Sequence, residues 1–125
     1  MEAVFPVATS EAYTTMKRSA PTAFGTAAKL IVARAGRLYR VTFVNTTATR
    51  AIVQLHDKAT APANTDVPIW MDACPSSAAG NGALTVDFGQ YGIYFANGIY
   101  VAASSTTTPL TLLAGDTMVA CALYA

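Results

Sequence analysis

The stretch Arg37-Leu-Tyr-Arg-Val-Thr-Phe-Val-Asn45 decides the fold class of this chain. Tyr39, Val41 and Phe43 alternate with a second set of positions that includes Arg40. A period of two is that of a β-strand, whose successive side chains point to opposite faces of a sheet. We therefore predict a strand over residues 37–45 with Tyr39, Val41 and Phe43 in the core.

The same alternation recurs in residues 50–57 and 82–88. In the first segment Gln54 and His56 fall on the face opposite Ala51, Val53 and Leu55, so we expect them to face solvent or a partner. In the second segment, the side expected to be buried carries Leu84, Val86 and Phe88.

Residues 93–101 contain Asn97-Gly98 between aromatic and β-branched residues, which is the pattern of a tight β-hairpin. Pro68 cannot donate to a strand ladder, so residues 67–72 are predicted as an edge strand. With further strands at 29–34 and 118–124, about 7–8 strands result, and we predict an all-β fold: a single-domain β-sandwich or jelly roll.

The 125 residues fit one domain. Because 53% of them are hydrophobic and only 12% charged, disordered and coiled-coil chains are excluded. Residues 1–28 hold few large apolar side chains and no sustained period, so we predict an extended N-terminal arm at 1–28 and the β-sandwich domain at 29–125. No apolar run approaches the roughly 20 residues of a membrane helix, and we expect no membrane partner.

Charge is divided unevenly along the chain. The first 58 residues carry all eight Lys and Arg with three acids, and the remainder carry four acids and no Lys or Arg. The cations stand singly among apolar residues, which is untypical of a nucleic-acid arm, so no nucleic-acid partner is expected. The two charge sets could pair between neighbouring copies or within one domain.

His56 and Cys74 are the candidates for nucleophilic chemistry. His56 is the only histidine, but Asp57, its neighbour on the strand, points to the opposite face and cannot orient the imidazole. Cys74, which we expect to be exposed, would need a third group and an oxyanion site that the sequence does not mark. We predict no catalytic residue and no enzyme. Cys121 reads as a small hydrophobe, and no disulfide with Cys74 is expected.

Neither a metal nor a cofactor is predicted. Asp57, Asp66 and Asp72 do not have the dense spacing of a calcium loop. Gly80-Asn81-Gly82 lacks the lysine and the helix of a phosphate-binding loop.

Aromatic residues provide a candidate contact surface. Tyr94 and Tyr100 lie symmetrically about Asn97-Gly98 and would share one sheet face if this segment were a hairpin. Together with Trp70 and Tyr91 they suit contact with protein better than sugar binding, because few acids and amides stand near them.

Several stretches follow one another along the chain: Val44-Asn-Thr-Thr47, Val53-Gln-Leu-His-Asp-Lys-Ala-Thr-Ala-Pro62, Thr65-Asp-Val-Pro68, Val86-Asp-Phe88 and Gly92-Ile-Tyr-Phe-Ala-Asn-Gly-Ile99. Across residues 38–124 this order resembles small all-β virion proteins of tailed bacteriophages. Some members of this group are capsid decoration (cement) proteins, and others are tail or fibre components.

The resemblance implies a structural role. We expect a capsid decoration protein that is made in the host cytoplasm and binds the outer surface of the head. Its partners would be the major capsid protein and further copies of itself, in an oligomer such as a trimer. The alternative is a receptor- or glycan-binding module of a tail or fibre.

Overall fold

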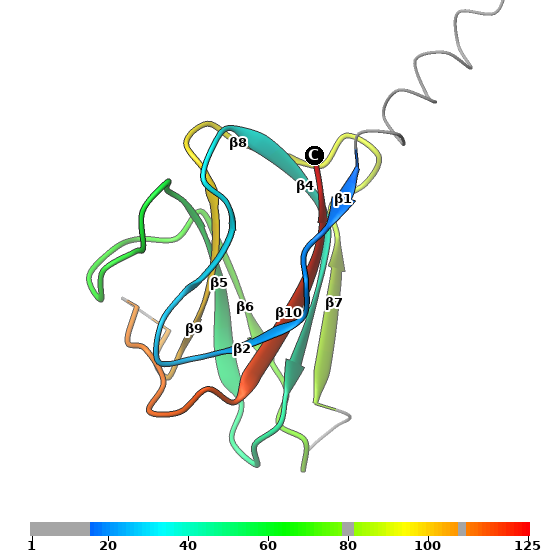
Figure 1. The fold of residues 1–125 in the computed structure, drawn as a ribbon. Helices are drawn as coiled ribbons and strands as arrows, with labels where there is room; N and C mark the ends of the chain where they lie inside the picture. The colour runs from blue at the N-terminus through cyan, green and yellow to red at the C-terminus, as the bar shows by residue number, and fades with distance from the viewer. Residues whose placement is uncertain (1–15, 79–81, 108–109) are drawn as a thin grey trace, which may run out of the picture.

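Ten strands form two antiparallel sheets in the computed structural model, which describes residues 16–78, 82–107 and 110–125 (Figure 1). The first sheet contains β1 (Lys17–Arg18), β2 (Thr22–Phe24), β4 (Gly36–Asn45), β7 (Ala83–Asp87), β8 (Ile93–Phe95) and β10 (Met118–Tyr124). The second contains β3 (Lys29–Val32), β5 (Ala51–Asp57), β6 (Trp70–Cys74) and β9 (Ile99–Ser104).

The strand order is that of a jelly roll. The first sheet runs β1-β10-β4-β7, with β2 also beside β10 and β8 also beside β4, and the second runs β3-β9-β5-β6. We count β1 and β2 as one strand position, because both pair with β10, and β7 and β8 as another, because both pair with β4. With the positions numbered along the chain, the first then pairs with the last, the second with the seventh, the third with the sixth and the fourth with the fifth. The predicted all-β sandwich is confirmed, with jelly-roll topology.

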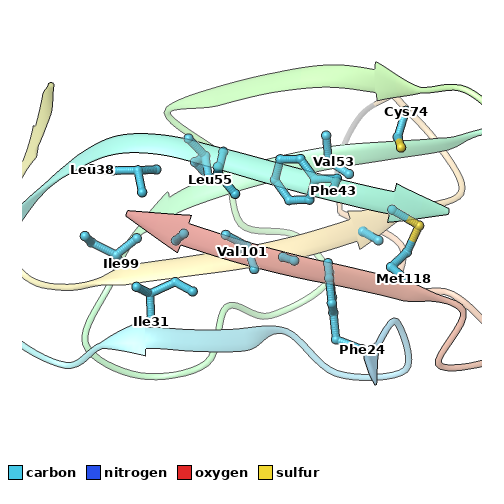
Figure 2. Packing of buried hydrophobic residues seen from close by; sticks show 14 of the residues in the cluster. Phe24, Ile31, Leu38, Phe43, Val53, Leu55, Cys74, Ile99, Val101 and Met118 are labelled. Atoms are coloured by element: carbon cyan, nitrogen blue, oxygen red, sulfur yellow. The ribbon is translucent and has the colours of Figure 1, made fainter. Parts of the chain in front are cut away.

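The core lies between the two sheets (Figure 2). Phe43 and Val41 of β4 are fully buried, as predicted, and pack with Val53 and Leu55 of β5. The side of residues 82–88 that was expected to be buried does face the core: Leu84, Val86 and Phe88 pack against it, although each is only partly buried.

The prediction that Tyr39 lies in the core is wrong, because β4 contains an irregularity at this residue. Leu123 of β10 pairs with Arg40, but the next residue, Tyr124, pairs with Leu38. Tyr39 is therefore an extra residue, and beyond it the two faces of the strand exchange. Leu38 is fully buried in its place, and Tyr39 is only partly buried.

The predicted hairpin over 93–101 is also wrong. β8 pairs with β4 in the first sheet, whereas β9 pairs with β3 and β5 in the second, so the chain crosses between the sheets at Asn97-Gly98. The carboxylate of Asp57 accepts hydrogen bonds from the backbone N–H groups of three consecutive residues there: Ala96 (3.1 Å), Asn97 (2.8 Å) and Gly98 (3.4 Å). A long-range contact, rather than strand pairing, holds this turn.

Part of the expected N-terminal arm belongs to the sandwich. β1 and β2 pair with β10, and Phe24 is 4% exposed within the core. These segments supply the first strand position of the jelly roll, so residues 17–24 are strands of the domain rather than an arm. Residues 1–15 of the expected arm lie outside the described residues.

The remaining strand predictions agree with the structure. β6 is an edge strand of the second sheet, as predicted for 67–72, although it begins at Trp70, after Pro68. β3 and β10 occupy the predicted positions near 29–34 and 118–124. Over the described ranges, no helix has the length and apolar character needed to span a membrane.

Replacing Phe24 by Ala should lower the free energy of unfolding by about 3 to 5 kcal/mol, the usual cost of deleting a buried aromatic side chain. Urea denaturation followed by circular dichroism measures the change. Leu30→Ala is the control, because Leu30 is 44% exposed. Its truncation should lower the free energy of unfolding by about 1 kcal/mol or less. Equal, small losses in the two variants would place residues 17–24 outside the folded unit.

Candidate functional site

Gln54 and His56 are buried, so the expectation that they face solvent or a partner is wrong. Both point away from the core, as the alternation predicts, yet they are only 0% and 1% exposed. The connection 58–69 and the described parts of the connection after β9, residues 105–107 and 110–113, lie on this outer side of the second sheet (Figure 1). Pro62 and Leu110, one from each connection, are buried as well. The protein thus covers the outer face of its own second sheet.

The two buried polar side chains are paired with each other. His56 Nε2 lies 2.8 Å from Gln54 Oε1. In the part of the chain that the structure describes, neither His56 Nδ1 nor Gln54 Nε2 has a hydrogen-bond partner. Burial is the main cause that lowers the pKa of His56, because a charged imidazolium would lose its hydration there. This histidine is neutral at pH 7.

Cys74 is fully buried in the core between the sheets, and the prediction of an exposed thiol is wrong. The reason is that β6 continues through Cys74, which pairs with Ala51. Burial raises the pKa of the Cys74 thiol, which makes it a poor nucleophile. His56 lies on the other side of the second sheet, so the structure does not bring the two residues together.

The carboxylates of the described chain serve the fold. Asp57 holds the 96–98 turn; burial alone would raise its pKa, but the N–H groups of Asn97, Ala96 and Gly98 lower it. Asp66 accepts from Lys58 Nζ at 2.6 Å, and this bond is the largest cause that lowers the pKa of Asp66.

No three His, Cys, Asp or Glu side chains come together as metal ligands within residues 16–78, 82–107 and 110–125. Asp57 and Asp66 are engaged in the bonds above, and Asp72 accepts from the backbone N–H of Ala73. Of the glycine segment, Gly80 and Asn81 lie outside the described residues. Gly82 leads into β7 with a positive φ of 71°.

Tyr94 and Tyr100 do not share a face, because they belong to different sheets. Tyr94 instead has a partner from β4: the Arg37 guanidinium carbon lies 5.4 Å from the centre of its ring. Arg37 Nη1 also donates a hydrogen bond of 3.0 Å to the backbone oxygen of Tyr91. Tyr91 and Tyr94 remain 76% and 56% exposed. We call Arg37, Tyr91 and Tyr94 the arginine–tyrosine cluster.

The outward side of the first sheet is accessible, in contrast to that of the second. We call this surface the open face. Strand register arranges its side chains in three rows across the sheet: Ala23, Val119, Val44 and Ala83; then Cys121, Thr42 and Thr85; then Arg18, Leu123, Arg40 and Asp87. All of them are partly or fully exposed in the structure described.

Cations gather at the end of the open face beside the third row. Five of the eight in the chain belong to this end, which we call the basic end: Lys17, Arg18, Arg34, Arg37 and Arg40. The described strands of the first sheet bring one carboxylate there, that of Asp87, which lies 3.3 Å from Arg40 Nη2 in an exposed ion pair. The Arg40–Asp87 and Lys58–Asp66 pairs join the two charge sets within the domain, one of the two uses that the sequence left open.

A shallow groove of about 280 Å³ opens beside the basic end. Its lining includes Tyr39, Arg40, Asp87 and Gln90. The displacement of Tyr39 from the core by the irregularity in β4 makes its ring available here. Sequence periodicity alone could not find this position.

No protein family matches the chain, and neither a curated protein sequence nor a solved structure shows significant similarity to it.

The stability of the protein should depend on pH through His56. The pKa of His56 is lower in the folded state than its ordinary 6.5, so the unfolded chain binds the proton more readily. The stabilisation is thus fully present above about pH 6.5 and declines progressively as the pH falls below that value. Urea denaturation at a series of pH values should show this decline in the native protein. His56→Gln should remove the decline, because no other histidine is present. The same decline in both proteins would show that His56 is not its cause.

Proposed function

We propose that this protein is a bacteriophage capsid decoration protein, which binds the outer surface of the head and bridges neighbouring copies of the major capsid protein. The observation that carries the proposal is the open face. The protein covers the outer side of its second sheet with its own connections, but leaves the corresponding side of the first sheet accessible. That surface is where another protein can dock.

The composition of the open face suits contact with a protein. Val, Ala, Thr and Cys fill its first two rows. Small and β-branched side chains lose little rotamer freedom when they are buried in an interface, so ordering them costs little free energy. The charged side chains of the basic end fix the orientation of docking more than they add to affinity.

Two further observations support a role in the virion. The stretches of residues 38–124 named above resemble small all-β virion proteins of tailed phages. Jelly rolls are also a recurring architecture of viral capsid and lectin domains, although a fold by itself does not determine function. Asp57 and His56 are engaged in contacts within the fold and Cys74 is buried in the core, which agrees with a structural role.

The second candidate is a receptor- or glycan-binding module of a tail or fibre. The groove of about 280 Å³ favours it, because an aromatic ring beside Arg40, Asp87 and Gln90 is a combination that can hold a sugar. Location in the particle separates the two candidates. Immunogold labelling on the head supports decoration, and labelling on the tail supports the receptor-binding module.

Val44→Glu tests the open face directly, because Val44 lies in its apolar row and is 38% exposed. Docking would bury an unpaired carboxylate, so affinity for undecorated heads should fall by about tenfold or more. Co-sedimentation with purified heads measures the affinity.

Val67→Glu is the matched control. Val67 is 84% exposed in the 58–69 connection, away from the open face, and its variant should bind as the native protein does. Thermal melts should show that both variants are folded. Equal binding by the two variants would rule out the open face as the docking surface.

A further inference from the structure

The arginine–tyrosine cluster is ordered before any partner arrives. The guanidinium of Arg37 is held over the ring of Tyr94 and by the backbone oxygen of Tyr91. An arginine that is already oriented loses less side-chain entropy when it forms hydrogen bonds to a ligand. Arginine and tyrosine are also the residue types that dominate the energy of protein interfaces.

The charge around the cluster is positive but not uniform. Among the described strands of the first sheet, the carboxylate beside these cations is that of Asp87, and it already neutralises Arg40 in part. Apolar side chains such as Leu123 lie among them. A continuous polyanion would bring phosphates or sulfates close to Asp87, whereas a protein surface can present carboxylates to the arginines and other groups to Asp87.

We propose that the basic end recognises carboxylate side chains on an acidic protein surface, with Arg37 and Arg18 as the principal contacts. The identity of that surface as the head's shell rests on the proposed function. Contact at this end fixes the direction in which the open face lies on the partner. The two surfaces are continuous, since Arg18 and Arg40 form the third row of the face.

Two single variants and a double variant test this proposal. Arg37→Ala and Arg18→Ala should each weaken binding to heads by about twofold to fivefold, the range of an exposed ion pair, and the double variant by about tenfold. Arg37→Ala also removes the hydrogen bond to Tyr91, which can disturb the 88–92 connection. Arg18→Ala tests the basic end without that effect. The double variant should also show a weaker dependence of affinity on salt between about 0.15 M and 1 M.

Arg50→Ala is the matched control, because Arg50 is exposed in the connection between β4 and β5, outside the basic end. It should bind heads as the native protein does. If the native protein binds heads and all three single variants bind equally well, the proposal for the basic end is overturned while the proposed function stands.

If the native protein does not bind heads, the proposed function fails, and a direct measurement decides the basic end. Titration with an acidic peptide in which Glu alternates with Ser and Gly should show saturable binding that Arg37→Ala weakens and Arg50→Ala does not. No binding, or equal loss in both variants, would overturn the proposal. Tighter binding of double-stranded DNA or heparin than of this peptide would overturn it as well, in favour of a continuous phosphate or sulfate polyanion.

Discussion

Burial of β5 on both of its faces is the constraint on which the rest of the structure depends. Val53 and Leu55 point into the core between the sheets, and Gln54 and His56 point into a layer formed by residues 58–69, 105–107 and 110–113. The second sheet therefore uses both of its surfaces internally. The first sheet uses only one, and its outward side becomes the open face. The asymmetry of the molecule follows from which sheet its long connections fold over.

The groups that usually carry chemistry serve this architecture. Asp57, at the end of β5, accepts the N–H groups of the turn through which the chain crosses from β8 to β9. His56 is neutral and paired with Gln54, and the Cys74 thiol lies in the core. Each of these groups is held by an internal contact, whereas the outward side of the first sheet stays accessible.

The sequence could predict what depends on local alternation and could not predict what depends on distant contacts. Val41 and Phe43 follow the period of a strand, and their burial was predictable from it. The burial of Leu38 in place of Tyr39 needs the irregularity opposite β10, and the crossover at Asn97-Gly98 needs Asp57, about 40 positions away in the chain. Nothing in the alternation of β5 indicates that two connections will cover Gln54 and His56. The strands β1 and β2 are too short to show a period at all.

The proposed docking of the open face on phage heads can be tested with the protein's own thiols. Cys121 lies in the middle row of that face and is partly exposed, whereas Cys74 is fully buried and reports unfolding. The rate of Cys121 alkylation by a maleimide should be measured for the free protein and for the protein bound to phage heads. Docking through the open face predicts that binding slows the reaction by about tenfold or more, while Cys74 stays unreactive in both states. An unchanged rate on the bound protein would contradict it, because the face would then still be open to solvent.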